Sequence, residues 1–287
     1  MQAFDEFGNM PPEFWAFIKF VGDKLKYTAK KTKANPDPTV KTFTFEELHE
    51  LVVKYDMNIG DDILHAAVRY IKLRADILNN FVRTSLMNGE EARRLYLQFS
   101  DQYANEELRS KIPHNLQTGE KKQTAYFTAL INLITELHIK YNTEIWPSMK
   151  PGFDCDPHNL MFVFDKRKDT LLGASSRRFD GVYPNTMSPQ IVWEIKEYYY
   201  TTTFGSRVAD GVYETELDGF ELKEIYDRTG IKIFHVLFVD AYDTWWGKGR
   251  SYLCRIIDIL NAGLVDEVIF GREIMTRWPE VLKSLIV

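Results

Sequence analysis

Three charged side chains lie in a stretch of sequence that otherwise has the pattern of two β-strands joined by a turn. Asp180 directly precedes Gly181 in the first strand, and Glu194 and Lys196 lie on the second. Because side chains alternate across a strand, Glu194 and Lys196 share one face and Trp193 points the other way. Burying a lone charge is costly, so we expect these residues to be paired or bound to a metal ion.

Two carboxylates and one ammonium group meet if the two strands pair. Carboxylates at the ends of adjacent strands suit a hard divalent cation, Mg²⁺ or alternatively Mn²⁺, which keeps several waters and accepts a phosphate oxygen. The cation polarises the phosphate and lowers the pKa of a bound water, while the lysine orients that water or stabilises negative charge. The residue types therefore predict phosphodiester hydrolysis by Asp180, Glu194 and Lys196.

The Glu-x-Lys triplet occurs three times, at Glu120–Lys122, Glu194–Lys196 and Glu221–Lys223. The first triplet lies in an expected linker, and the third in an expected helix, where residues i and i+2 do not face each other. Only Glu194–Lys196 is on a strand that follows an aspartate-bearing strand. The alternative is a charged sheet edge without catalytic function.

The elements that must position these residues follow a predicted linker, "SKIPHNLQTGEKKQ". Hydrophobic periodicity predicts helices and strands in an order typical of an α/β fold, in which the late elements alternate as a crossover connection requires. The expected elements are a helix over 124–141, strands in "NLMFVFD", "SSRRFDGVY" and "QIVWEIKEYYY", a helix over 206–228, a strand in "IKIFHVLFVD", a helix over 251–262, a strand in "DEVIFG" and a helix over 273–285.

The first part of the chain has a different pattern, which is helical throughout. Thr44 is a candidate N-cap for a short helix, and a longer helix follows the turn "DMNIG". We therefore divide the chain into a helical N-terminal region, residues 1–118, with a role in DNA binding or assembly, and an α/β core, residues 119–287. The segment from Lys19 to Lys41 is rich in lysine, and it is either a solvated surface or an arm that contacts phosphates through Lys30 and Lys31.

The stretches "FDGVY" and "WEIK", in a helix, three strands, helix, strand order, resemble the PD-(D/E)XK nuclease superfamily. This resemblance implies the restriction-endonuclease-like fold, with a mixed central sheet flanked by helices. The resemblance covers the second half of the chain, and Phe179 stands where the motif has proline. It implies that Asp180 and Glu194 bind the metal and that Lys196 assists the attacking water. It also implies a further acidic ligand from the first core helix, for which Glu136 is the candidate.

This resemblance implies a Mg²⁺-dependent DNA endonuclease of the restriction or defence type that acts as a homodimer. A DNA repair or junction-resolving nuclease would use the same three residues. A third interpretation is a nuclease-fold protein that binds nucleic acid without cleaving it.

Three further basic residues are candidates for DNA contact. Arg207 lies at the start of a predicted helix, where backbone N–H groups favour anions. Lys248 and Arg250 follow Trp245 and Trp246, which offer stacking and charge if the loop is exposed. The alternatives are an ordinary surface arginine and a packed aromatic loop.

Composition excludes several other classes of protein. Only two cysteines are present, too few for a disulfide framework or a four-cysteine zinc site. No apolar run approaches the roughly 20 residues of a membrane helix, and the acidic N-terminus does not resemble a signal peptide. The formal charge of −5 describes the average surface and does not exclude a local basic groove. We expect a cytoplasmic protein with no membrane association and no small-molecule cofactor.

Overall fold

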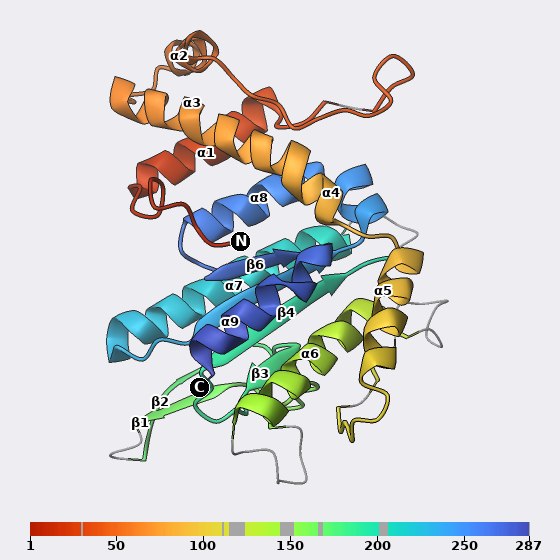
Figure 1. Ribbon diagram of the computed structural model, residues 1–287. Coiled ribbons are helices and arrows are strands. Elements are labelled where there is room, and N and C mark those ends of the chain that lie inside the picture. Colours follow the sequence, from red (N-terminus) through yellow and green to blue (C-terminus); the bar gives the residue numbers. More distant parts are fainter. Residues whose placement is uncertain are drawn as a thin grey trace.

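The computed structural model describes residues 1–29, 31–110, 112–114, 124–143, 152–165, 169–200 and 206–286 (Figure 1). Helices of the first part come before the strands, as the hydrophobic pattern predicts. In chain order the elements are α1 (Pro12–Leu25), α2 (Phe45–Lys54), α3 (Asp61–Asp76), the π-helical η1 (Ile77–Val82), α4 (Arg83–Ser85), α5 (Gly89–Gln102), α6 (Tyr126–Asn142), β1 (Phe162–Asp165), β2 (Thr170–Ala174), β3 (Gly181–Tyr183), β4 (Ile191–Glu197), α7 (Ser206–Thr229), β5 (Phe234–Asp240), the π-helical η2 (Asp243–Lys248), α8 (Arg250–Asn261), β6 (Glu267–Phe270), the 3₁₀-helical η3 (Gly271–Met275) and α9 (Arg277–Leu285).

A four-stranded mixed sheet forms the centre of the molecule, in the order β3-β4-β5-β6. Strand β3 pairs antiparallel with β4, and β4, β5 and β6 are parallel. Parallel strands need a crossover connection, which α7 supplies between β4 and β5 and α8 between β5 and β6. The α/β class with a mixed, helix-flanked sheet is therefore confirmed.

Helices cover both faces of this sheet. On one face, Ile191 and Trp193 of β4 pack in a core with α6 and α9. On the other face, Val192 packs with Leu222 and Ile225 of α7. The alternation predicted for β4 is thus observed, and it places Glu194 and Lys196 on the α7 side. Gly181 is required opposite Trp193, because a Cβ atom at Gly181 would overlap the indole ring.

The N-terminal helices α1, α2 and α3 surround a separate apolar core and lie at one end of the molecule, beyond α8 (Figure 1). The predicted N-cap is observed, because the Thr44 side chain accepts a hydrogen bond from the Glu47 backbone N–H in a capping box. Where α3 meets α8, the buried Arg74 donates to both carboxylate oxygens of Asp258, at 2.7 and 3.0 Å. Tyr70 donates to the same carboxylate at 2.6 Å.

The strands before α7 differ from the expectation. A hairpin of β1 and β2 occupies the region where we expected one strand and a charged turn, and only the end of "SSRRFDGVY" is a strand. The intervening serines are held by side-chain contacts: Ser175 Oγ accepts from Met161 N, and Ser176 N donates to Glu221. These hydrogen bonds involve side chains instead of a neighbouring strand's backbone. The segment "SSRRFD" therefore leads into β3 without being a strand itself.

None of the described helices is long and apolar enough to cross a membrane.

Candidate functional site

Asp180 and Glu194 lie side by side at the edge where β3 begins. Asp180 N donates to Trp193 O, and the Asp180 carboxylate accepts from Ile195 N at 2.7 Å. This pairing holds Asp180 beside the middle of β4, close enough for the charge of Glu194 to act on it. The convergence expected from the sequence is therefore observed for these two carboxylates.

Lys196 completes the predicted group. Its Nζ lies 2.7 Å from Glu194 Oε2 and 3.4 Å from Glu214 Oε2, and both Glu194 and Lys196 are buried. Gly211 of α7 leaves room for the lysine, because a Cβ atom there would press on the Lys196 side chain and on the Tyr198 hydroxyl. Trp245 donates from Nε1 to the Lys196 carbonyl at 3.2 Å, which fixes the backbone at this point of β4.

Three further residues join this group. Arg177, just before β3, places Nη1 2.7 Å from Asp218 Oδ2 and 3.1 Å from Glu194 Oε1. Its Nη2 lies 3.2 Å from Glu214 Oε2. Glu214 and Asp218 come from consecutive turns of α7, so the helix supplies a second pair of carboxylates opposite the sheet. We call the group of Arg177, Asp180, Glu194, Lys196, Glu214 and Asp218 the acidic site.

The acidic site has more carboxylates than cations. Four carboxylates face Arg177 and Lys196, which leaves a formal surplus of two negative charges. Glu194 Oε1 and Asp218 Oδ1 are buried and accept no hydrogen bond from the described residues, although Arg177 Nη1 lies within ion-pair distance of Glu194 Oε1, at 3.1 Å. Unpaired buried oxygens are costly unless something binds them.

Loss of solvation and the charge of Glu194 raise the pKa of two carboxyl groups. The pKa of Asp180 is raised to about 7, first because surrounding protein atoms reduce its solvation, although it keeps accessible surface, and second because of Glu194. The same two causes raise the pKa of Asp218 to about 7. Burial by itself lowers the pKa of Lys196, but the neighbouring carboxylates, chiefly Glu194, raise it above its ordinary value, so the lysine stays an ammonium at neutral pH.

The donor set of the acidic site suits Mg²⁺ or Mn²⁺. No group of three or more His, Cys, Asp and Glu residues within the described part of the chain is arranged to enclose a metal ion. Mg²⁺ does not need such an enclosure, because it is commonly held by one or two carboxylates, several waters and a substrate phosphate. Asp180 and Glu194 would supply those carboxylates, and Glu194 Oε1 would become a ligand where the Arg177 guanidinium leaves it.

Glu136, the ligand expected from the first core helix, is not part of this group. It is buried on α6, which covers the opposite face of the sheet from Glu194. Its carboxylate accepts hydrogen bonds from the backbone N–H groups of Arg109 and Ser110 and from the Ser110 hydroxyl. Glu136 therefore anchors the chain that follows α5, and the additional acids of the site come from α7 instead.

The basic residues expected to contact DNA have different surroundings. Lys248 is exposed at the end of η2. Arg250 is buried, donates to Trp246 O at 2.8 Å and lies over the Trp246 ring. Trp245 and Trp246 are also buried, so this loop has the packed aromatic structure, and Arg250 is removed from the candidate DNA contacts.

Two candidate contacts fall wholly or partly outside the described residues. Arg207 lies in the first turn of α7, but its side chain is outside the described part. Lys30 is also outside it, whereas Lys31 is exposed.

A signal for one of the missed residues is present in the sequence. Asp218 interrupts the buried stripe of α7, which runs through Val212, Thr215 and Leu222 at helical spacing. A carboxylate at a core position of an amphipathic helix indicates a partner or a ligand. Arg177 has no such signal, because an arginine before a strand is ordinary, and its neighbour Arg178 is exposed.

The fold and the acidic site define an α/β protein in which carboxylates gather between one face of the central sheet and the crossover helix α7. The chain belongs to the family described as Domain of unknown function (DUF7687), whose model matches residues 87–285. A second model, Domain of unknown function (DUF7690), matches residues 1–81, so the two models meet between α3 and α5. No curated protein and no solved structure matches the chain.

Proposed function

We propose that this protein is a Mg²⁺-dependent DNA endonuclease with a restriction-endonuclease-like core and that the acidic site is its catalytic centre. The observation that carries the proposal is the meeting of Asp180, Glu194 and Lys196 where β3 begins beside β4, on the side of the sheet that α7 covers. Support for the fold comes from the order of α6, antiparallel β3 and β4, crossover helix α7 and parallel β5. Restriction or defence in the cytoplasm, by a homodimer, is the biological role that this class of site favours.

Each residue of the acidic site has a defined role in this reaction. Asp180 and Glu194 would hold the divalent cation, which would supply polarisation of the phosphate and a lowered pKa for a bound water. Lys196 remains protonated, so it orients the attacking water and stabilises the negative charge that develops on the phosphate, and it does not act as a general base. Asp180 would bind the cation in its ionised form, so its raised pKa of about 7 makes cation binding weaker as the pH falls below 7.

Arg177 determines how the cation enters. It lies against Glu194 Oε1, and Lys196 occupies Oε2, so both oxygens of Glu194 already face a positive group. For Oε1 to serve as a metal ligand, the Arg177 guanidinium would have to leave it, and the guanidinium could then hold a substrate phosphate, the group that arginine binds in bidentate geometry.

The same contact supports a second candidate function, a nuclease-fold protein that binds nucleic acid without cleaving it. In that protein Arg177 would be the permanent counter-ion of Glu194 and Asp218. A repair or junction-resolving nuclease is a further variant, because the chemistry of the site does not depend on the shape of the DNA.

One experiment separates these functions. Purified protein is incubated with supercoiled plasmid, branched DNA and single-stranded DNA, in 5 mM Mg²⁺ or in EDTA, beside Asp180→Asn and Lys196→Gln. We expect Mg²⁺-dependent cleavage that falls by at least about a hundredfold in either variant, because each removes a group that acts on the reacting phosphate. Asp227→Asn and Lys283→Gln are matched controls on the exposed surface of α7 and α9.

Cleavage that survives EDTA or both active-site substitutions would exclude the metal mechanism. Binding of DNA without cleavage in the presence of Mg²⁺ would favour the non-catalytic function. A fixed cut position on the plasmid favours a restriction enzyme, and preference for the branched substrate favours a repair or junction-resolving enzyme.

A further inference from the structure

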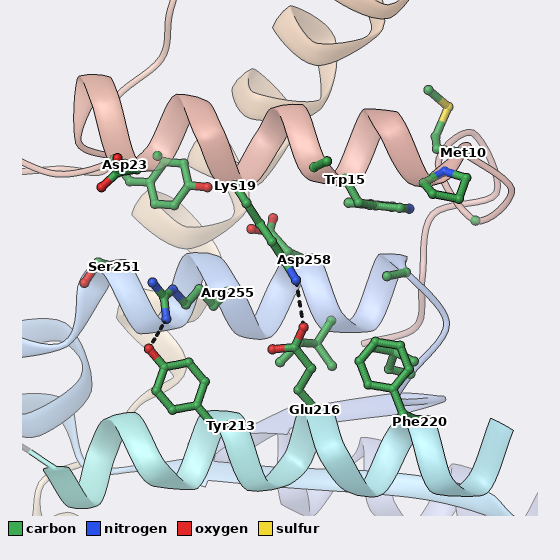
Figure 2. Close-up of a pocket in the computed structure, with 18 of the residues that line it drawn as sticks. Met10, Trp15, Lys19, Asp23, Tyr213, Glu216, Phe220, Ser251, Arg255 and Asp258 are labelled. Atoms are coloured by element: carbon green, nitrogen blue, oxygen red, sulfur yellow. Dashed lines mark hydrogen bonds and ion pairs between the residues drawn. The ribbon is translucent and has the colours of Figure 1, made fainter. Parts of the chain in front are cut away.

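A second site lies between the N-terminal helices and the α/β core. It is a cleft of about 1070 Å³, with α8 as its floor and α1 and α7 as its walls (Figure 2). No residue of the acidic site lines it. Small-molecule sites are typically about 300 to 1,000 Å³, and they often lie where two parts of a protein meet.

One end of the cleft is apolar. Trp15 lies on the side of α1 that faces α7, where Phe220 projects toward it, and Met10 also lines this end (Figure 2). Phe220 is 54 % exposed, although a phenylalanine gains about 1.5 to 3 kcal/mol when it is fully buried. An apolar or flat ligand body at this end would cover that surface.

The other end presents a cation that has no acidic partner. Arg255 Nη1 of α8 donates a hydrogen bond to the Tyr213 hydroxyl oxygen at 2.5 Å, and its guanidinium lies over the Tyr213 and Tyr252 rings. The other lining cations, Lys19, Lys26 and Lys223, each pair with a carboxylate. Among the described residues, Arg255 is thus the only cation of the cleft without a carboxylate within ion-pair distance. The Ser251 hydroxyl, one turn earlier on α8, lies beside it (Figure 2).

A salt bridge crosses the cleft between its two ends. Lys19 Nζ of α1 lies 2.8 Å from Glu216 Oε1 of α7 (Figure 2). The lysine is 64 % exposed, and exposed ion pairs of this kind contribute only about 0 to 1 kcal/mol. The bridge therefore opens at little cost when a ligand enters, and the released ammonium adds a second positive group.

We propose that this cleft binds a small organic anion with an apolar, flat or alkyl body. Its acidic group pairs with Arg255 and Ser251, and its body lies along the helices against Phe220 and Trp15. A phosphate or a carboxylate on such a body provides the same chemistry, so a nucleotide and a fatty acid are its two sources. Ligand binding at the cleft does not depend on nuclease activity, and its failure leaves the proposed function unaffected.

The test uses the full chain and the fluorescent probe 8-anilinonaphthalene-1-sulfonate, which has a flat apolar body and one sulfonate. We expect saturable binding at one site and about tenfold weaker binding by Arg255→Gln, the loss typical of a charge-assisted hydrogen bond. Phe220→Ala weakens binding as well. N-phenyl-1-naphthylamine, which has the same body without the sulfonate, is insensitive to Arg255→Gln.

Matched controls lie on α7, the helix that carries Phe220, but outside the cleft. Arg228→Gln removes an exposed arginine of α7, and Tyr226→Ala removes an exposed aromatic ring, and both should bind the probe like the wild type. Glu216→Gln tightens probe binding, because Lys19 is then released toward the anion. Circular dichroism and thermal melting establish that each variant is folded.

Competition then identifies the source of the ligand. Displacement of the probe by AMP assigns a nucleotide-like body, and displacement by laurate assigns an alkyl body. The proposal would be overturned if Arg255→Gln and Phe220→Ala bound the probe as tightly as the control variants. Failure of both competitors at the Arg255-dependent site would overturn it as well.

Discussion

Two arginine–carboxylate groups in this protein are built differently. At the junction of α3 and α8, one arginine, Arg74, meets one carboxylate, Asp258, and both oxygens of that carboxylate accept hydrogen bonds. At the acidic site, Arg177 and Lys196 face twice as many carboxylates, and two carboxylate oxygens lack a hydrogen-bond partner within the described residues. Balanced charge is what a structural contact needs, whereas surplus negative charge beside accessible surface is what a cation site needs.

The largest effect is expected when the balanced group is broken. Arg74→Met leaves the Asp258 carboxylate buried without its counter-ion, which should lower the free energy of unfolding by about 3 to 5 kcal/mol, measured by urea denaturation at pH 7. Replacing both partners, Arg74→Met with Asp258→Leu, should cost clearly less because no charge is left alone. The control is Arg69→Gln, which removes an exposed ion pair with Glu6. Equal losses for Arg74→Met and Arg69→Gln would contradict the distinction.

Removing the arginine of the acidic site is expected to strengthen an interaction, the binding of a divalent cation. Arg177→Gln removes the guanidinium that competes with a cation for Glu194 Oε1, so Mn²⁺ affinity measured by calorimetry should rise about tenfold. Arg178→Gln is the matched control, since Arg178 is the exposed neighbour. If cleavage falls while Mn²⁺ affinity rises, Arg177 also holds the substrate phosphate. Unchanged affinity would show that the guanidinium and the cation do not compete.

The raised pKa of Asp180 gives a stability that depends on pH. The fold favours the protonated form, so this group stabilises the protein below its ordinary pKa of 3.8, and that stability is lost as pH rises through about 7. Asp180→Asn, which is always neutral, should therefore raise stability at pH 8 by no more than about 1 kcal/mol, since solvent screens the accessible carboxylate, and by less at pH 5.

Mg²⁺ provides the complementary measurement for the same variant. At pH 8, 10 mM Mg²⁺ should raise the melting temperature of the wild type but not that of Asp180→Asn, because a cation that binds only the folded state stabilises it. The wild-type shift should shrink at pH 5.5, where Asp180 binds a proton instead. A shift of equal size in both proteins would place the cation elsewhere.

The smallest effect is expected for the basic segment before α2. Lys31 and Lys33 are exposed, so replacing both with Gln should weaken DNA binding a few-fold and reduce the slope of log affinity against log salt by about one per lost phosphate contact. Lys283→Gln, an exposed lysine of α9, is the control. A salt slope equal to that of the control would identify the lysines as ordinary solvated surface.

Much of the arrangement around β4 was predictable from the sequence. A strand alternates its side chains with period two, so the apolar residues around Glu194 and Lys196 already place both charges on one face. The capped helix at Thr44 and the crossover helix between β4 and β5 were predictable for the same reason, because their signals lie within a few neighbouring residues. Local geometry determined these features.

Only the tertiary structure decided which residues share the site. Glu136 and Asp218 are both helical carboxylates, but α6 packs on one face of the sheet and α7 on the other, so only Asp218 reaches Glu194's partner Arg177. The position of Arg177 and the cleft at Arg255 likewise depend on contacts between segments far apart in the chain. Helix packing on a sheet is set by the summed burial of many side chains, which no short motif encodes.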